Sequence, residues 1–189
     1  ENMVRHMILN SLRMYRSKFK QEFGELVLFF DSRHYWRRDH FPNYKAGRKK
    51  SRESSNLDWD AIFGCLNDIK QELKDVFPYK FVEVYGAEAD DVIAALCLEL
   101  EYDNGKTLIL SGDKDFIQLH RFRNVSQYSP ITKKMMVNDN PHQYLDEHIL
   151  KGDSSDGVPN VLSPDNTFVD GLRQKPLSKK KIAEWTGEI

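Results

Sequence analysis

The sequence is poor in cysteine and has no long hydrophobic run, and both absences narrow the possible functions. Its two cysteines, Cys65 and Cys97, lie far apart in helix-like apolar segments and form no Cys-x-x-Cys pair. We therefore predict buried free thiols rather than a disulfide or a zinc site. No apolar run is long enough to cross a membrane and no signal peptide is recognisable, so we expect a soluble intracellular protein.

Two catalytic motifs are also missing. There is no Gly-x-x-x-x-Gly-Lys-Ser/Thr loop, which counts against an NTPase. The six histidines have no His-Glu-x-x-His or Cys-x-x-Cys companion, which counts against a zinc hydrolase. The 189 residues, 40% hydrophobic and 30% charged, are typical of a globular protein with one core, or one core and a small appendage.

The net charge of −1 hides a segregation of charge along the chain. Residues 33–52 contain eight Lys and Arg residues against one acid, whereas residues 72–103 contain nine acids against two lysines. The first region suits an anion and the second a cation. Solvated surface charge is the simpler alternative.

The stretch 107–119 predicts a site at the end of a strand. Leu108–Leu110 is continuously apolar, as in a strand covered on both faces, and a Ser-Gly turn follows it. Asp113 and Asp115 come next, where catalytic groups of open α/β sheets collect. The ordinary alternative is that Asp113 is the N-cap, and Asp115 a first-turn acid, of a following helix.

Acids follow two other predicted strands in the same way. Asp31 comes after the strand predicted over residues 25–30. Glu88, Asp90 and Asp91 come after the strand predicted over residues 80–85 and open a helical run. One such cluster is a common helix N-terminal preference, but three at equivalent places argue for a shared function.

Residues 32–56 are predicted to form a long polar connection in which aromatic residues interleave with cations. Tyr35, Trp36, Phe41 and Tyr44 are the aromatic residues. Cations bind phosphates and rings stack on unpaired bases, so this mixture suits single-stranded nucleic acid. A flexible charged loop whose rings dock on the core is the alternative.

Helical periodicity predicts helices over residues 3–21 and 58–76, and another from Pro141 to Leu150. After the last of these, a tight polar loop over residues 151–160 carries Asp153 and Asp156. Residues 171–181 then hold five Lys and Arg residues and no acids, which suits a duplex phosphate backbone or an ordinary surface corner.

Seven carboxylates are candidates for one site, and such a cluster needs counter-ions because like charges a few ångströms apart repel strongly. They are Asp31, Glu88, Asp90, Asp113, Asp115, Asp153 and Asp156. Mg²⁺ prefers a few carboxylates and waters. Two such ions about 4 Å apart would favour phosphodiester hydrolysis.

Four ordered motifs resemble the 5′ nuclease (flap endonuclease) family, and the resemblance covers nearly the whole chain. They are Gly86-Ala-Glu-Ala-Asp-Asp-Val-Ile-Ala94, Ser111-Gly-Asp-Lys-Asp-Phe-Ile-Gln-Leu119, Tyr44-Lys-Ala-Gly-Arg48 and Lys151-Gly-Asp-Ser-Ser-Asp-Gly-Val-Pro159. Residues 2–12, 35–39 and 151–153 are most similar to the ribonuclease H branch found in T-even phages.

The resemblance implies an α/β fold with a PIN-like, mostly parallel sheet flanked by helices. A nuclease core over residues 1–140 would carry a basic arch over residues 32–57. Residues 141–189 would form an incomplete helix-three-turn-helix element that binds DNA. The implied activity is that of a divalent-metal-dependent 5′ to 3′ exonuclease and flap endonuclease, which removes RNA primers and 5′ flaps during replication.

The resemblance also implies residue roles. Asp31, Glu88, Asp90 and Asp113 would serve a first Mg²⁺, and Asp115, Asp153 and Asp156 a second, with Mn²⁺ as a possible substitute. Asp91 matches a supporting acid. Lys45 and Arg48 would act on the scissile phosphate. The nucleic-acid-binding residues would be Arg33, Arg37, Arg38, Tyr44, Lys45, Arg48, Lys49, Lys151, Lys179 and Lys180.

Two departures qualify this resemblance. The family's first aspartate, at the end of an N-terminal strand, is absent, so we expect a fragment that lacks one first-metal ligand and is weakly active or inactive alone. Residues 161–166 replace the usual Gly-x-Gly-x-Lys-Thr-Ala segment, which puts a monovalent ion and a duplex contact in doubt.

The expected partners are DNA with a 5′ flap or an RNA–DNA hybrid, together with a replication clamp and a single-strand-binding protein for the full-length protein. We expect a monomer without membrane contact, in the cytoplasm of the host cell if a phage encodes it. The alternatives are a non-catalytic nucleic-acid-binding domain with structural metals, and a PIN-type ribonuclease.

Overall fold

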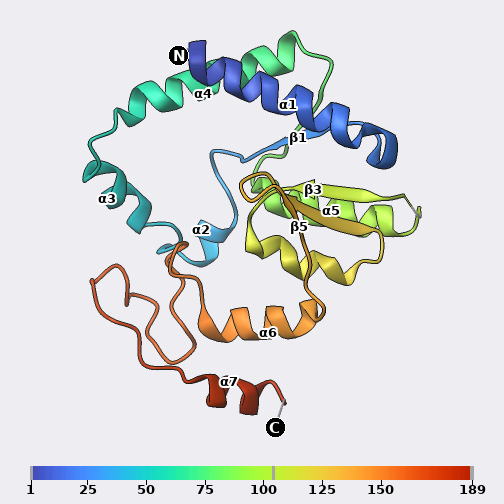
Figure 1. Cartoon of the computed structure of the whole chain (residues 1–189). Helices are drawn as coiled ribbons and strands as arrows, with labels where there is room; N and C mark the ends of the chain where they lie inside the picture. The colour runs from blue at the N-terminus through green and yellow to red at the C-terminus, as the bar shows by residue number, and fades with distance from the viewer. Residues whose placement is uncertain (1, 104, 188–189) are drawn as a thin grey trace. The chain divides into compact units, whose positions relative to one another are not determined.

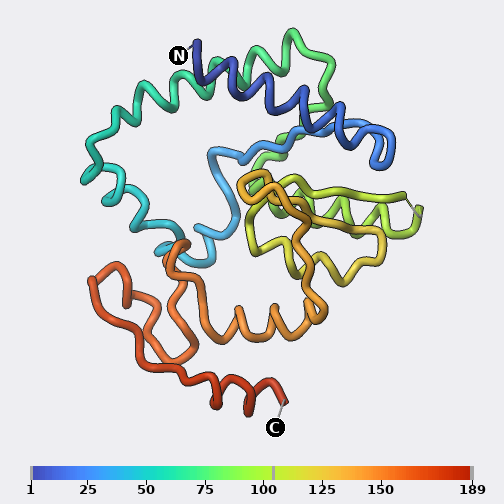
Figure 2. The backbone as a smooth tube through the Cα atoms, in the orientation of Figure 1, coloured from blue at the N-terminus to red at the C-terminus, as the bar shows by residue number. Residues whose placement is uncertain are grey.

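The structure, a computed structural model, describes residues 2–103 and 105–187. The chain divides into two compact units. The first comprises the residues up to His34 together with Asn56–Thr107, and the second comprises Tyr35–Ser55 together with the chain from Leu108 onward. Figures 1 and 2 trace this path, in which the chain leaves the first unit at His34, returns to it at Asn56 and leaves it again after Thr107.

The first unit is built on a pair of parallel strands. It contains α1 (Asn2–Phe23), β1 (Val27–Phe30), α4 (Trp59–Asp75), β2 (Lys80–Glu83) and α5 (Ala89–Glu101). Val27 lies opposite Lys80 and Phe30 opposite Glu83, and α5 packs against β1. Because the strands are parallel, both end at the same edge of this sheet, where Asp31 and the N-terminus of α5 follow.

Local sequence explains the long helix α4. The Asp58 side chain caps it by accepting a hydrogen bond from the Ala61 amide at 3.0 Å, and the apolar face buries Ile69 and Leu73. The Arg5 guanidinium of α1 donates to the Glu72 carboxylate, which ties the two helices together. The helices predicted over residues 3–21 and 58–76 are thus confirmed.

The second unit is built on a three-stranded sheet in the order β3-β4-β5. Its elements are α2 (Arg37–His40), α3 (Gly47–Glu53), β3 (Thr107–Leu110), the 3₁₀ helix η1 (Lys114–Arg121), β4 (Val125–Ser129), β5 (Lys134–Met136), α6 (Pro141–Lys151) and α7 (Lys179–Trp185). Strands β4 and β5 form an antiparallel hairpin in which Ser129 lies opposite Lys134. Helix α6 packs against η1, so the loop that follows α6 is held near the start of η1.

The core of the second unit lies between this sheet and η1. Ile109 of β3, Phe116 and Leu119 of η1, and Tyr128 of β4 are all buried. Burial of such side chains typically contributes about 1.5–3 kcal/mol each, so these residues fix the end of β3 relative to η1.

The α/β fold and the parallel pairing of β1 with β2 are confirmed. Three details differ from the prediction. In the part of the chain that the structure describes, the strands fall into two sheets rather than one; the antiparallel pair β4–β5 within the second lies where the sequence predicts a strand at residues 125–129 and a hairpin over residues 130–137. The helix predicted after Asp115 is a 3₁₀ helix, and the long connection over residues 32–56 contains the short helices α2 and α3.

The structure also bears on the predictions about the cysteines and about membrane-spanning helices. Cys97 is buried and Cys65 is half-buried, and both thiols are free, as predicted. No helix formed by residues 2–103 or 105–187 is both long and apolar enough to span a bilayer. The division of the chain at residue 140 and the helix-three-turn-helix element stay predictions.

Candidate functional site

Asp113 and Asp115 are fixed by the turn that connects β3 to η1. The Asp113 amide donates to the Ser111 hydroxyl at 3.1 Å, and Asp113 Oδ1 accepts from the Asp115 amide at 3.0 Å. Asp113 is therefore the N-cap of η1 and Asp115 lies in its first turn, as the ordinary alternative predicted. These positions place both carboxylates just beyond the end of β3, so capping and a role in a site are compatible.

Gln127 of β4 holds this turn through hydrogen bonds of its side chain, and it was missed in the sequence analysis. Its side chain is fully buried, and Nε2 donates to the carbonyl oxygens of Ser111 at 2.9 Å and Asp113 at 2.6 Å. Its Oε1 lies 3.0 Å from Nε2 of His120. The only indication of this role in the sequence was a long polar side chain within a predicted strand. Because its bonds end on the backbone of the acidic turn, Gln127 holds the carboxylates in place.

Asp153 is held in a tight loop after α6. Its amide and carbonyl bridge to Val158 with two hydrogen bonds of 2.8 Å. Asp153 Oδ1 accepts from the Ser155 amide at 2.7 Å, the Ser155 hydroxyl at 2.6 Å and the Asp156 amide at 3.3 Å. Burial alone would raise the pKa of Asp153, but the bonds from Ser155 and Asp156 outweigh burial and lower it. Asp153 is thus held as a carboxylate.

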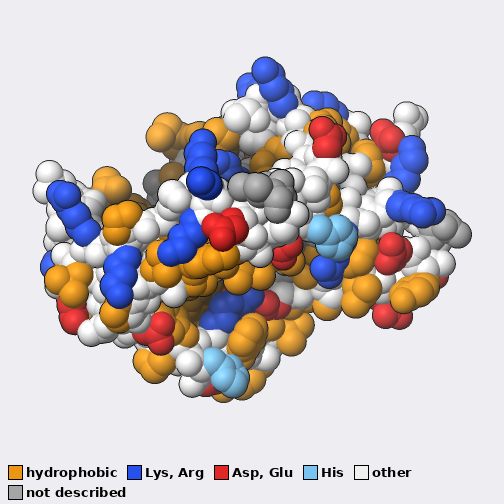
Figure 3. All heavy atoms as spheres, turned by 90° about the horizontal axis from the view of Figure 1, so that it is seen from below, with side chains coloured by type: hydrophobic (Ala, Val, Ile, Leu, Met, Phe, Trp, Pro, Cys, Tyr) orange, Lys and Arg blue, Asp and Glu red, His pale blue; other side chains and the backbone are white. Residues whose placement is uncertain are grey.

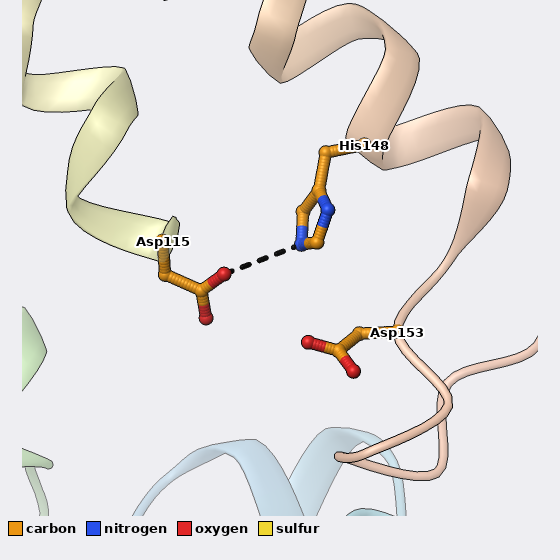
Figure 4. Close-up of side chains that lie close together, drawn as sticks. All are labelled: Asp115, His148 and Asp153. Carbon is orange, nitrogen blue, oxygen red and sulfur yellow. Dashed lines mark ion pairs between the residues drawn. The ribbon is translucent and has the colours of Figure 1, made fainter. Parts of the chain in front are cut away.

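Three side chains from η1, α6 and the following loop meet at one point. One ligand atom each from Asp115, His148 and Asp153 lie within 4.8 Å of one another, and His148 Nε2 is 3.4 Å from Asp115 Oδ1. Figure 4 shows all three side chains directed towards a common space. Two carboxylates and one imidazole are a suitable donor set for a divalent cation, because they supply negative charge and leave coordination positions open.

The electrostatics of this cluster also suit a cation. Burial and the neighbouring charge of Asp113 raise the pKa of Asp115, with further repulsion from Asp153 and Asp156, while His148 opposes the shift. The cluster therefore concentrates negative charge that its protein neighbours only partly compensate. His148 was missed in the sequence analysis because it lacks a metal-binding motif and lies on an ordinary amphipathic helix.

Asp156, predicted as a metal ligand, contacts cationic and phenolic groups instead. Its Oδ1 accepts from Arg48 Nη2 at 2.6 Å, its Oδ2 accepts from the Tyr44 hydroxyl at 2.9 Å, and Lys45 Nζ lies 3.8 Å away. The Asp156 carbonyl also accepts from the Lys45 amide at 2.7 Å. Tyr44, Lys45 and Arg48 are thus brought together around a carboxylate, and their contact with nucleic acid stays a prediction. A role of Asp156 in metal binding stays a prediction.

The remaining predicted acids lie in the first unit. Asp31 Oδ1 accepts from the Ala89 amide at 2.7 Å, which places Asp31 at the N-terminus of α5. Glu88 is the buried N-cap of α5 and shares a capping box with Asp91, whose carboxylate accepts from the Glu88 amide at 3.1 Å. Asp90 lies in the first turn. These acids all lie around the N-terminus of α5, and a shared site with the acids of the second unit stays a prediction.

The predicted nucleic-acid-binding residues are mostly solvent-facing. The Arg37 guanidinium lies over the Trp36 ring at 4.8 Å and that of Arg38 over the Tyr35 ring at 4.7 Å, and Lys151 pairs with Glu147. The other exposed cations in this predicted set are Arg33, Arg48, Lys49, Lys179 and Lys180, whereas Tyr44 is buried. On the face drawn in Figure 3, Lys and Arg side chains are interspersed with hydrophobic ones. The binding of nucleic acid by these residues stays a prediction.

Known proteins resemble this chain over most of its length. Ribonuclease H of Enterobacteria phage T4 is 39% identical over 191 residues, which are 97% of this chain and 62% of that protein. Flap endonuclease Xni of Shewanella sp. (strain MR-4) is 32% identical over 67% of this chain and 48% of its own length. The chain therefore spans less than two thirds of these relatives.

A solved structure agrees in fold. The flap endonuclease D15 of bacteriophage T5, in a complex with DNA and metal ions, superposes with a TM-score of 0.72 at 18% identity, over 97% of this chain and 76% of that one. Residues 2–148 match the family described as 5′-3′ exonuclease, N-terminal resolvase-like domain. The chain belongs to this 5′-3′ exonuclease family.

Proposed function

We propose that this protein is a divalent-metal-dependent 5′ nuclease that hydrolyses phosphodiesters of RNA primers and 5′ flaps on DNA during replication. The observation that carries the proposal is the meeting of Asp115, His148 and Asp153 beyond the end of β3, in a chain of this family. The names of its relatives, a ribonuclease H and a flap endonuclease, support the choice of substrate.

The acids divide between two proposed ion positions. Asp115 and Asp153, with Asp156, would hold one Mg²⁺, and Asp31, Glu88, Asp90 and Asp113 would hold the other, with Mn²⁺ as a substitute in either. A bound pair of such cations supplies an activated water and stabilises the attacking and leaving oxygens of a phosphodiester. The hydrogen bonds to Asp113 and Asp153 orient these carboxylates before any ligand arrives.

Tyr44, Lys45 and Arg48 are the proposed contacts to the scissile phosphate. They already surround the carboxylate of Asp156 with a phenol and two cations, and the same groups suit a phosphate oxygen. Arg33, Arg37, Arg38 and Lys49 would bind the 5′ strand. Duplex DNA would be bound by Lys151, Lys179 and Lys180. We further propose a cytoplasmic monomer that works with a replication clamp and a single-strand-binding protein.

One observation favours a second function. Asp113 and Asp153 both have local structural roles as an N-cap and a turn residue, which fits a non-catalytic nucleic-acid-binding domain with structural metals. In that case the carboxylates would stabilise loops, and substitutions that keep their hydrogen bonds would leave every activity unchanged. A PIN-type ribonuclease, which acts on RNA alone, is distinguished by its substrate.

The test is cleavage of a 5′-labelled flap duplex by the full-length protein in Mg²⁺. Asparagine is as good an N-cap as aspartate, so Asp113→Asn should preserve the turn while it removes the charge. We expect the cleavage rate to fall at least about 100-fold with DNA binding retained, because a metal-holding charge is lost. Asp146→Asn, an exposed change on α6, is the control.

Equal cleavage by wild type and Asp113→Asn would reject the site. Binding of the flap with no cleavage by the wild-type protein would instead favour the non-catalytic function. Cleavage of RNA hairpins without cleavage of DNA flaps would favour the ribonuclease.

A further inference from the structure

The cluster at the end of α6 contains a nitrogen donor among its oxygen donors. His148 projects from the last turn of α6 towards Asp115, and Asp153 follows α6 in the next loop. Figure 4 shows the edge of the imidazole facing the space between the two carboxylates. A histidine in this place changes which cations the position can prefer.

We propose that His148 is a ligand of the cation held by Asp115 and Asp153, and that its nitrogen makes this position prefer Mn²⁺ and similar transition-metal ions over Mg²⁺. The inference rests on the proposed function in taking a divalent cation as the occupant, and it revises that function at this one position, where Mn²⁺ rather than Mg²⁺ becomes the preferred ion. It concerns selectivity at one position, whereas the proposed function concerns the reaction.

Donor chemistry supports this preference. Mg²⁺ takes oxygen ligands and keeps several waters, so a neutral imidazole contributes little to its binding. First-row transition-metal ions bind imidazole more strongly than Mg²⁺ does, and Mn²⁺ accepts carboxylate and imidazole together. Replacing one oxygen ligand by His148 therefore weakens Mg²⁺ binding relative to Mn²⁺ at the same place.

The geometry allows all three groups to bind one ion. Ligands about 2.1 Å from a metal are at most about 4.2 Å apart, and the three ligand atoms here already lie within 4.8 Å of one another. Small side-chain rotations close the difference. The side chains of His148 and Asp115 are 34% and 35% exposed, so they have room to rotate and a hydrated ion can reach them.

Neighbouring groups hold the donors in this orientation. The His148 ring stacks on Tyr144, with ring centroids 5.9 Å apart and an interplanar angle of 11°. The carboxylate of Asp153 is oriented by Ser155 and the Asp156 amide, which bond to Oδ1. Such supporting contacts around ligands typically change metal affinity about 10–100-fold when they are removed.

The competing explanation is that His148 is only the charged partner of Asp115. In that case the imidazolium neutralises a carboxylate and would have to be displaced by any cation. Removing His148 would then affect all divalent ions alike, because an ion pair does not distinguish Mn²⁺ from Mg²⁺.

The experiment measures metal binding directly. The full-length protein, His148→Leu and His142→Leu would be titrated with Mn²⁺ and with Mg²⁺ by isothermal titration calorimetry. His142 is an exposed residue at the start of the same helix and is the matched control. We expect His148→Leu to lose at least about tenfold in Mn²⁺ affinity at one position while Mg²⁺ affinity changes less than about threefold, and His142→Leu to match wild type.

A second readout uses the unmodified protein. Sub-stoichiometric Mn²⁺ should broaden the imidazole ¹⁵N signals of His148 before those of the other histidines. Parallel changes in Mn²⁺ and Mg²⁺ affinity, no change in either, or unperturbed His148 signals would overturn the inference. Selective Mn²⁺ binding in a protein that cuts no flap would keep the inference and reject the proposed nuclease.

Discussion

Asp115 lies in surroundings that oppose its own charge. Burial and the charge of Asp113 raise its pKa, and Asp153 and Asp156 add to the repulsion. Folding alone would not favour this position for the Asp115 carboxylate, because burial and the neighbouring negative charges make its ionised form less stable than in water. Side chains whose position lowers the stability of the folded state are typical of functional sites.

The pH dependence of stability should show this cost. A raised pKa means that the folded state keeps the Asp115 proton to higher pH than the unfolded state. The stability contribution of Asp115 is therefore lost as the pH rises from its ordinary pKa of 3.8 through the raised value. We expect Asp115→Asn, in EDTA, to melt at a higher temperature than wild type at pH 7, and to lose this advantage below the ordinary pKa.

The two proteins share all other titrating groups, including Asp153 with its lowered pKa, so the difference between their melting curves isolates Asp115. A wild type more stable than Asp115→Asn at pH 7 without metal would contradict the argument. Divalent cations should reverse the order, because they stabilise only the protein that binds them well.

Residue types predicted part of the candidate site. Asp113, Asp115 and Asp153 could be found because acids follow strand and helix ends in the sequence. Gln127 and His148 could not, because each acts through a partner distant in sequence or on another element. Asp156 was predicted only as a metal ligand, and its direct contact with Arg48 was not foreseen.

At the scale of elements, the junction after α6 depends on one glycine. Gly152 has φ +66° and ψ −174°, a combination that residues with a Cβ avoid. A Cβ there would lie 2.4 Å from the Val158 carbonyl oxygen and 2.5 Å from that of Pro159. Both contacts are with backbone, which side-chain rotation cannot relieve, so the Asp153 loop requires glycine.

We expect Gly152→Ala to destabilise the protein by more than about 2 kcal/mol, from backbone strain together with the clash. Gly171→Ala is the control, because Gly171 also has a positive φ of +70° but a Cβ there meets nothing within 4 Å. Its cost should be about 1 kcal/mol. Chemical denaturation of both variants measures the difference, and equal costs would show that the close backbone approach is unimportant.

Elements with strong apolar periodicity were predicted well, and those held by distant contacts were not. The limits of α4 and α6 follow from Asp58, Pro141 and their apolar faces. Helices α2 and α3 have short polar sequences without such a face. Residues 43–48 are instead fixed by residues 156 and 165, through Lys45, Arg48 and Asn43. Local sequence contains no signal for those contacts.

At the scale of the whole molecule, positive and negative side chains are concentrated in different segments of the chain, which the net charge does not reveal. Cations dominate residues 33–52 although the chain carries a formal charge of only −1. Association with a nucleic-acid strand should therefore depend on salt much more steeply than the net charge suggests, because phosphate contacts release counter-ions locally.

A triple variant of Arg37, Arg38 and Lys49 to Gln should bind a single-stranded 5′ flap with a shallower salt dependence. The slope of log K against log salt concentration should fall by about 2, because each single-strand phosphate contact contributes roughly 0.7. Fluorescence anisotropy in EDTA measures this without cleavage. Replacing Arg13, Lys18 and Lys20 of α1 by Gln removes the same charge elsewhere and should leave the slope unchanged.

Long-range pairing was the least predictable part of the fold. The pairing of β3 with β4 joins strands that are separated by η1, and strand propensity alone does not predict it, whereas the antiparallel pair β4–β5 joins neighbouring segments in which the sequence predicts a hairpin. The parallel pair β1–β2 was easier, because a helix between two buried strands favours a parallel crossover.

The contacts of Asp156 have one further consequence. Its carboxylate accepts from Tyr44 and Arg48 and lies near Lys45, so a cation that draws Asp156 away would remove the negative charge that now faces the Arg48 guanidinium and would favour another anion there. Conversely, a phosphate that draws Arg48 away leaves Asp156 ready for a cation. The two ligands are then thermodynamically linked, and each strengthens the binding of the other by the same factor. If Asp156 binds an ion and Arg48 binds the strand, a single carboxylate would make the two binding events cooperative.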